Sequence, residues 1–419
     1  MALLKRVFFF FVFTTHSSLA DRRAAPTIMA PRWVKQVFWT MAVSGFVYVV
    51  GVLSLVHPVV QRNATYVHNL NPTFFQDLSN VEAFGFLRHQ VQPFTIQSTD
   101  NVTLYAWHIL PVHLYRSHKT ELQAAGPPTL HDWESAAESI GVRLLLENPQ
   151  ANVVVSFHGN AGHLASSYRS ATYQQILSLS TEERPVHVIT FDYRGFGLST
   201  GSPSEGGVID DGLAVMSALC GISREQARSL IPSQIILLGQ SMGTFISTAT
   251  FYDWTFKLRQ APFKALVLIA GFSSLPKLLD SYSIGGFAPP VFSPLVQYPR
   301  VKAWLRNKLV DKWDTGSRLV EMVTQPDLSL DLTMMHAADD WEIPYREGHR
   351  NWDLIAEAVN GTGQMVKSHD QVSHPSFVST WTSEDGKKQV RFEKVRHGGH
   401  NKIPTSEHLK DILHDIIDR

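Results

Sequence analysis

The sequence has very few of the residues that build disulfides and metal centres. It contains one cysteine, Cys220, among 419 residues, which excludes an intrachain disulfide and a cysteine-rich metal site. Neither an H-E-x-x-H motif nor a cysteine–histidine spacing occurs, so we expect no metal. Cys220 itself lies in the apolar run LAVMSALC, which predicts a core residue rather than a nucleophile.

The chain also lacks an excess of charge of either sign. It has 37 basic and 37 acidic residues without a Lys/Arg cluster, so we expect no nucleic acid partner. FDYRGFGLSTG approaches a dinucleotide fingerprint, but its glycines are spaced G-x-G-x-x-x-G, and Tyr193 and Arg194 would crowd a pyrophosphate turn. We therefore expect no nicotinamide cofactor.

Long hydrophobic runs occur only near the start of the chain. Residues 7–13 are too few to span a bilayer, whereas residues 37–56 form an uncharged run of 20, about 30 Å long as a helix. We expect a transmembrane anchor at 37–56, between a segment of residues 1–36 and a linker of residues 57–89. Six basic residues precede the run and only Arg62 occurs in the next thirty, which predicts a cytosolic N-terminus. The remaining domain would then be lumenal, in the endoplasmic reticulum or another endomembrane.

Two other interpretations of the N-terminus stay open. A signal peptide cleaved after Ala20 would reverse this topology and leave the large domain in the cytosol. A start at Met29 would keep it. Sequons at Asn63, Asn101 and Asn360 are compatible with a lumenal, glycosylated domain, although about two are expected by chance.

Short apolar runs dominate the chain after residue 150. They are NVVVSF (152–157), VHVITF (186–191), QIILLG (234–239), KALVLIA (264–270) and LTMMHA (332–337). Continuous apolarity is typical of strands buried on both faces, and segments long enough for helices separate the first four. The pattern predicts an α/β fold with a doubly wound, mostly parallel sheet. We also expect a hairpin from FTIQS and VTLYAWHI, an insertion over 112–150 with one helix near ESAAESIGVRLLLE, and a last strand, KQVRFEKV.

One serine lies where such a sheet places its chemistry, at the carboxyl end of a strand. Ser241 follows QIILLG and precedes MGTFISTATFYDW, which is expected to be a helix. Gly239 and Gly243 would let strand and helix pack closely around a strained turn that exposes the hydroxyl. The pattern predicts a nucleophile, although serine is also a common helix N-cap.

A serine hydroxyl needs a base and an orienting carboxylate before it can attack. HAADDWEIP places Asp339 and Asp340 at a strand end, and RHGGHNKIP places His397 and His400 in a loop after the last expected strand. These residues alone leave the choice within each pair open.

Attack on an acyl carbonyl also needs hydrogen-bond donors for the developing negative charge. The segment FHGNAGH follows a strand, and Gly159 within it would let a backbone N–H approach the carbonyl oxygen. We expect the two donors to be the backbone amides of Asn160 and of Met242, which follows the serine.

Five blocks of sequence now point to a known family: FHGNAGH, FDYRGFGLSTGSPSE, GQSMGT, HAADDWEIP and GGHNKIP. In this order, over roughly residues 90–419, they resemble the α/β-hydrolase superfamily. More narrowly they resemble its membrane-anchored serine hydrolases, the branch with monoacylglycerol and lysophosphatidylserine lipases. The resemblance implies a triad of Ser241, Asp340 and His400. Ala337 departs from the usual glycine, and the polar stretch 361–387 is longer than a compact member needs.

An apolar segment rich in proline and glycine follows KALVLIAGFSSL. In DSYSIGGFAPPVFSPLVQYP, the prolines Pro289, Pro290 and Pro294 exclude a regular helix across the segment. In this fold an insertion here, about 272–321, forms a lid, and we expect Phe287, Phe292 and Leu295 to contact an acyl chain. The alternative is a satellite cluster that packs on the core.

The sequence therefore predicts a single-pass membrane serine hydrolase that cleaves a lipid-like ester, of monoacylglycerol or lysophospholipid type, without a cofactor. The alternatives are a peptidase or amidase with the same triad and a membrane-anchored scaffold without activity. The acyl length, the head group and the oligomeric state cannot be read from these residues.

Overall fold

The computed structural model describes residues 31–419 except 71, 222–228, 287–289, 291 and 368–375. The chain divides into two compact units, Met1–Ser54 and Leu55–Arg419. In the first, helix α2 (Arg32–Ser54) is the one described helix long and apolar enough to cross a bilayer, with a mean hydropathy of 1.8. It covers most of the predicted anchor at 37–56. The proposed cleavage after Ala20 and the start at Met29 lie outside the described residues.

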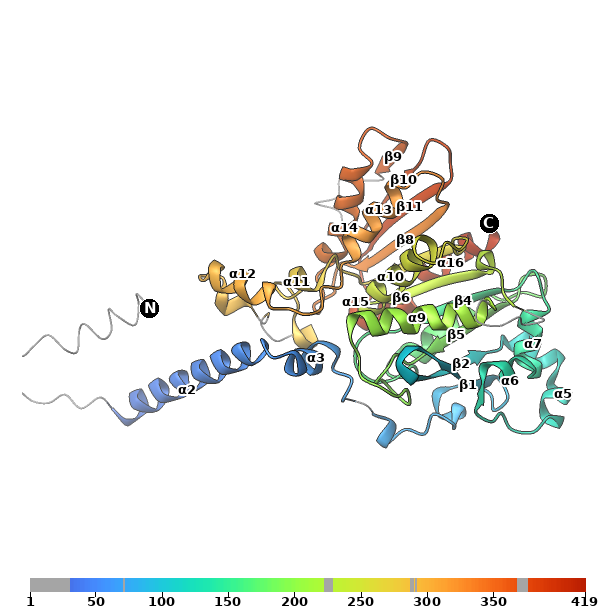
Figure 1. Ribbon diagram of the computed structural model, residues 1–419, viewed down its shortest axis with the longest axis horizontal. Coiled ribbons are helices and arrows are strands. Elements are labelled where there is room, and N and C mark those ends of the chain that lie inside the picture. Colours follow the sequence, from blue (N-terminus) through green and yellow to red (C-terminus); the bar gives the residue numbers. More distant parts are fainter. Residues whose placement is uncertain (1–30, 71, 222–228, 287–289, 291, 368–375) are drawn as a thin grey trace, which may run out of the picture. The chain divides into compact units, whose positions relative to one another are not determined.

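The second unit is built around one sheet of 11 strands in the order β3-β1-β2-β5-β4-β6-β7-β8-β11-β10-β9 (Figure 1). The six strands β5-β4-β6-β7-β8-β11, in this sheet order, are parallel to their neighbours, which confirms the predicted doubly wound sheet. The predicted hairpin is the antiparallel pair β1 and β2. The strands are β1 (Val91–Gln97), β2 (Thr103–Ile109), β3 (His131–Asp132), β4 (Asn152–Phe157), β5 (Val186–Phe191), β6 (Ile235–Gln240), β7 (Ala265–Ile269), β8 (Leu330–Ala337), β9 (Gln364–Lys367), β10 (Phe377–Thr382) and β11 (Lys388–Val395).

Helices cover both faces of this sheet, which is why the central strands are apolar throughout. One buried cluster joins the sheet to α9 (Glu205–Leu219), α10 (Met242–Phe256), α13 (Thr315–Thr324) and α14 (Tyr345–Ala358). A second cluster joins the opposite face to α8 (Arg169–Leu177) and α16 (Glu407–Asp418). The carboxyl ends of the parallel strands stay accessible to the connecting loops.

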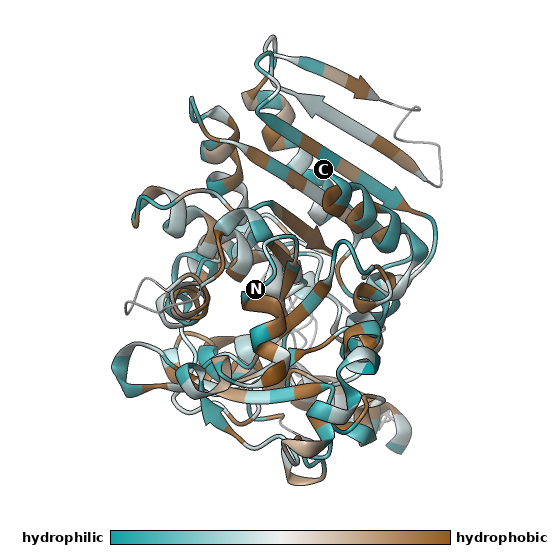
Figure 2. Cartoon of the chain, turned by 90° about the vertical axis from the view of Figure 1, so that its right-hand side faces the viewer, coloured by the Kyte–Doolittle hydropathy of each residue, from teal (hydrophilic) through white to brown (hydrophobic). Residues whose placement is uncertain are grey.

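Two regions differ from the sequence-based expectation. The insertion over 112–150 contains α4 (Val112–Ser117), α5 (Lys119–Ala124), α6 (Trp133–Ala137) and α7 (Ile140–Leu146), not one helix. The expected helix is broken because the backbone of Ser139 is extended, with ψ 148°, and α7 begins after it. The polar stretch 361–387 contains β9 and β10, which continue the sheet antiparallel beyond β11. Alternate residues of β10 are buried, and Figure 2 shows these outer strands at the top of the sheet.

The insertion between β7 and β8 forms a cap region. It contains α11 (Leu275–Leu278), two single turns of 3₁₀ helix and α12 (Pro299–Asn307) before α13 begins. As the prolines predict, no regular helix is described between α11 and α12.

Candidate active site

Ser241 occupies a sharp turn between β6 and α10. Its φ of 53° and ψ of −120° are values that residues with a side chain rarely adopt. A Cβ added to Gly243 would lie 2.0 Å from the carbonyl oxygen of Phe157, and one added to Gly239 would lie 2.3 Å from Ser247 Oγ. The turn therefore requires glycine on both sides, and it places Ser241 at the carboxyl end of β6.

A buried histidine–carboxylate pair lies on neighbouring loops. His400, in α15 (Gly399–Lys402), has Nδ1 2.8 Å from Oδ2 of Asp340, which follows β8. The other oxygen of Asp340 accepts hydrogen bonds from the backbone amides of Glu342 at 3.0 Å and Ile343 at 2.9 Å. Because Nδ1 of His400 is held by the carboxylate, Nε2 is the nitrogen free to exchange a proton.

Burial and charge act against each other on this pair. Burial alone would raise the pKa of Asp340, but the positive charge of His400 and hydrogen bonds from His336 and His400 hold it well below its usual range. Burial alone would lower the pKa of His400, but the charge of Asp340 and its hydrogen bond raise it above 6.5. Asp340 is therefore ionised at neutral pH, and it makes His400 a stronger base.

The neighbouring residues Asp339 and His397 are arranged differently. Oδ1 of Asp339 accepts a hydrogen bond of 2.8 Å from the backbone amide of Gly399, and Oδ2 lies 3.4 Å from Nδ1 of His397. The His397 side chain is 73% exposed. The structure thus brings Asp340 to His400, while Asp339 holds the backbone of the loop before His400.

Two contacts connect the loops around Ser241. Nε2 of Gln240 donates a hydrogen bond of 3.0 Å to the carbonyl oxygen of His400. A Cβ added to Gly159 would lie 3.4 Å from Cβ and 3.9 Å from Oγ of Ser241. The loops after β4, β6, β8 and β11 therefore meet at one edge of the sheet, as expected for the carboxyl ends of parallel strands.

The two expected oxyanion donors are the backbone amides of Met242 and Asn160. Met242 is the first residue of α10, and the first amides of a helix have no intrahelical acceptor. Among the described residues, no hydrogen bond uses the backbone amide of Asn160. The side chain of Asn160 donates a hydrogen bond of 2.6 Å to the carbonyl oxygen of Thr65. This bond holds Asn160 in place without using its backbone amide.

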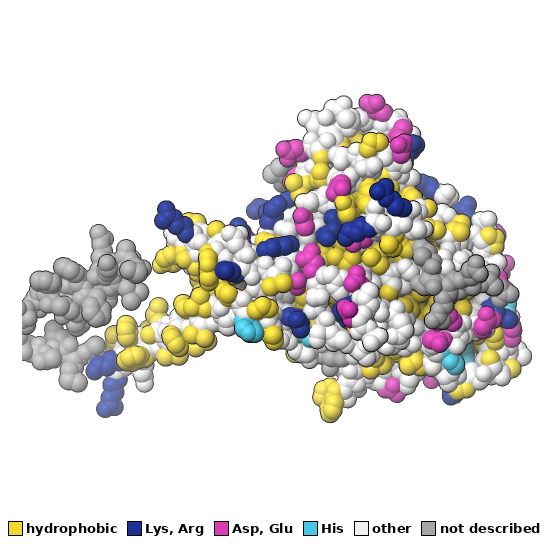
Figure 3. Space-filling model, viewed as in Figure 1, with side chains coloured by type: hydrophobic (Ala, Val, Ile, Leu, Met, Phe, Trp, Pro, Cys, Tyr) yellow, Lys and Arg dark blue, Asp and Glu magenta, His cyan; other side chains and the backbone are white. Residues whose placement is uncertain are grey.

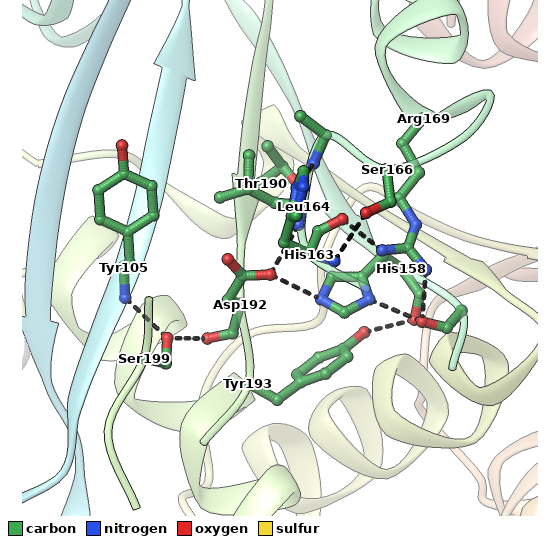
Figure 4. A network of polar contacts seen from close by, with 12 residues as sticks. Tyr105, His158, His163, Leu164, Ser166, Arg169, Thr190, Asp192, Tyr193 and Ser199 are labelled. Atoms are coloured by element: carbon green, nitrogen blue, oxygen red, sulfur yellow. Dashed lines mark hydrogen bonds and ion pairs between the residues drawn. The ribbon is translucent and has the colours of Figure 1, made fainter. Parts of the chain in front are cut away.

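Arg169, the first residue of α8, holds the loop that contains Gly159 and Asn160 (Figure 4). Its Nη2 donates to the carbonyl oxygens of Gly159 at 2.8 Å, Asn160 at 3.2 Å and Ala161 at 2.9 Å. Its Nη1 donates to the carbonyl oxygen of His163. Hydrogen bonds from a charged donor are strong, so one guanidinium fixes carbonyls that no regular element satisfies. Sequence patterns do not single out Arg169, because its partners are all backbone atoms.

The two histidines of FHGNAGH support the same loop. Nδ1 of His158 lies 2.7 Å from the carbonyl oxygen of Gly159, and Nε2 lies 3.3 Å from Oδ1 of the buried Asp192 (Figure 4). Burial lowers the pKa of His163 to about 4, and its Nε2 lies 2.6 Å from Oε1 of Gln76. His163 is therefore a neutral residue of this loop.

The cap region contacts the loop that follows Asp340. The backbone amide of Ser283 donates a hydrogen bond of 3.0 Å to the carbonyl oxygen of Glu342. Among the expected lid residues, Phe287 lies outside the described residues, Phe292 is only 2% exposed and Leu295 is half-buried. The burial of Phe292 favours the packing alternative at this position.

Comparisons with known proteins agree with this fold. The family model "Alpha/beta hydrolase family" matches residues 153–412. A lysophosphatidylserine lipase of Danio rerio is 26% identical over 326 residues, 77% of this chain and 73% of that protein. Its counterpart in Rattus norvegicus is 25% identical over 318 residues, 75% of this chain and 69% of that protein. The crystal structure of an alpha-beta hydrolase from Vibrio vulnificus has a TM-score of 0.52 at 14% identity, with 85% of this chain and 91% of that one covered, and shows the fold alone. The chain therefore belongs to the α/β-hydrolase family.

Proposed function

We propose that this protein is a membrane-anchored serine hydrolase that cleaves carboxylic esters of lysophospholipid or monoacylglycerol type. The observation that carries the proposal is the buried hydrogen bond of 2.8 Å between Asp340 and His400, next to a serine held in a left-handed turn. A scaffold would have no use for this aligned pair. The relatives named lysophosphatidylserine lipases support a lysolipid substrate.

In the proposed reaction, Nε2 of His400 takes the proton of Ser241 as its Oγ attacks the acyl carbonyl. The backbone amides of Asn160 and Met242 donate hydrogen bonds to the oxyanion. His400 then protonates the leaving alcohol, and water, activated by the same histidine, releases the fatty acid from the acyl-enzyme. Asp340 keeps the proton of His400 on Nδ1 and stabilises the imidazolium that forms.

The location of the catalytic unit is the finer part of the proposal. The basic residues before α2 and the single Arg62 after it favour a cytosolic N-terminus and a lumenal hydrolase unit, in the endoplasmic reticulum or another endomembrane. A lumenal unit anchored by α2 could take amphiphiles from the membrane surface.

A fluorophosphonate probe tests the nucleophile, with the full-length protein in membranes. The wild type should be labelled, and Ser241→Ala should not be labelled while its thermal unfolding stays unchanged. Fatty acid release should be measured in parallel from lysophosphatidylserine, from a monoacylglycerol and from an acyl-amide substrate. Labelling of Ser241→Ala at the wild-type level would show a different nucleophile, and turnover of the amide alone would favour the amidase alternative.

A further inference from the structure

The cap region presents a group of exposed apolar side chains on and around α12. Val296, Tyr298, Val301, Trp304 and Val310 are 63%, 51%, 44%, 44% and 61% exposed, and we call these five residues the cap face. Val301 and Trp304 are three residues apart in the helix, so their side chains lie on the same side. Figure 3 shows yellow hydrophobic side chains gathered over α12.

The other side of α12 is held to the domain. Leu305 is 4% exposed, Nζ of Lys302 lies 2.8 Å from Oδ1 of Asp280, and Arg306 pairs with the same carboxylate. These contacts fix the rotation of the helix about its axis. The exposure of Val301 and Trp304 is therefore set by the packing of α12.

Basic residues predominate around the cap face, and Asp280 and Asp311 flank it in the sequence. Residues 281–310 contain four basic residues and no aspartate or glutamate. Asp280 pairs with two of them, whereas Arg300 and Lys308 are exposed and form no ion pair with any described residue. Helices that lie in the interface of an anionic membrane typically combine exposed apolar residues with unpaired basic residues.

The chain itself keeps this region near a membrane. Six residues separate Ser54, the end of α2, from Gln61 in α3 (Pro58–Tyr66), and so short a link spans at most roughly 25 Å. The side chain of Gln61 donates a hydrogen bond of 2.7 Å to the carbonyl oxygen of Lys308 and accepts one of 2.9 Å from the backbone amide of Val310. The residues that follow the anchor are thus bonded directly to the end of the cap face.

We propose that the cap face lies on the surface of the bilayer that α2 spans. Val301 and Trp304 enter the headgroup boundary, and Arg300 and Lys308 lie beside anionic headgroups. This contact is a second membrane attachment in addition to α2, and it does not depend on the assignment of Ser241. It turns the cap region, whose base contacts the loop of Asp340, toward the layer that holds lipid-like substrates. Binding of a protein partner would not explain why the cap face is bonded through Gln61 to the residues that follow α2, or why its exposed unpaired charges, Arg300 and Lys308, are both basic.

The experiment uses the full-length protein with Cys220→Ser and Val301→Cys, labelled at residue 301 with the environment-sensitive fluorophore NBD. The protein is reconstituted in phosphatidylcholine vesicles with and without phosphatidylserine, and quenching by a nitroxide lipid is measured. The matched control carries the label at Leu258→Cys, because Leu258 is also apolar and 41% exposed. It lies just past the far end of α10, about 20 Å from Ser241 along this helix. Thermal unfolding of both variants, compared with the wild type, checks that they are folded.

In vesicles with phosphatidylserine, NBD at residue 301 should emit at shorter wavelength and be quenched roughly threefold more than at residue 258. Replacing Arg300 and Lys308 with glutamine should reduce this quenching to the value seen in phosphatidylcholine alone. Equal quenching at residues 301 and 258 would overturn the proposal. So would emission at shorter wavelength without quenching by the nitroxide lipid, because residue 301 would then be covered by a second protein molecule and not by lipid.

Discussion

Replacing Arg169 with methionine removes the guanidinium that holds four carbonyl groups between Gly159 and His163, while a side chain of similar length remains. Asn160, the proposed donor in this loop, lies between two of these carbonyls. Loss of one oxyanion donor costs about 10²–10³ in kcat in serine hydrolases. Met242 belongs to α10 and keeps its place, so only one of the two donors is disturbed. We expect kcat to fall by roughly 10², about 2.7 kcal/mol, with KM nearly unchanged.

The assay is steady-state hydrolysis of a short soluble ester, with active sites counted by fluorophosphonate titration. Each hydrogen bond to a charged donor stabilises a fold by about 1.5–3 kcal/mol, so thermal unfolding must be measured and the assay run well below the transition. Arg184→Met is the matched control, because Arg184 makes an exposed ion pair with Asp418 and should change neither parameter. Methylguanidinium should partly restore kcat to Arg169→Ala and should not restore Ser241→Ala. An unchanged kcat, or a loss explained by the unfolded fraction alone, would refute this role of Arg169.

Three further predictions concern the acid, the base and the topology. Asp340→Asn should lower kcat by about 10³ or more, because the tautomer of His400 is no longer fixed. Asp339→Asn keeps an acceptor for the amide of Gly399 and should lower kcat far less. The reverse result would show that Asp339, and not Asp340, is the catalytic acid. The acid limb of kcat/KM should lie above pH 6.5, since protonated His400 cannot accept the serine proton, and Asp340→Asn should shift this limb to lower pH because the charge that raises the His400 pKa is gone. If the unit is lumenal, the exposed Asn101 should carry a glycan that an endoglycosidase removes and that Asn101→Gln lacks, whereas Asn63 donates its side-chain amide to Val59 within α3 and should be a poor acceptor; cleavage of the unit by protease outside sealed microsomes would show the opposite topology.

The central strands could be predicted because strands buried on both faces are continuous runs of apolar residues. β4, β5 and β11 begin and end at the expected residues. β10 was harder to recognise because only alternate residues, such as Phe377 and Trp381, are buried, and the strand lacks the continuous apolar run of the central strands. The break of the helix near Ser139 depends on one backbone angle that its neighbours do not predict.

In the candidate site, features set by neighbouring residues could be predicted, whereas features set by contacts between distant segments could not. The glycines around Ser241 could be interpreted because the turn itself forbids a Cβ there. The residues themselves did not separate Asp339 from Asp340, since adjacent residues differ only in the direction that the chain takes after β8; the family resemblance implied Asp340, which is the residue that faces His400. Arg169 stayed hidden because a residue that binds only carbonyl oxygens has no sequence partner to reveal it.

Residues 57–89, which we predict to be a linker, belong to the same compact unit as the sheet. Tyr66 is fully buried in its core, and its ring lies 5.4 Å from that of Trp313 at the start of α13. On one side the carbonyl oxygen of Thr65 accepts the hydrogen bond from Asn160, and on the other side Gln61 is bonded to the end of the cap face. One short helix, α3, therefore contacts both the loop of Asn160 and the cap region, and it ends a dozen residues after α2. Because a buried aromatic ring and partly buried hydrogen bonds resist rearrangement, α3 joins the loop of Asn160 to the cap region within the hydrolase unit.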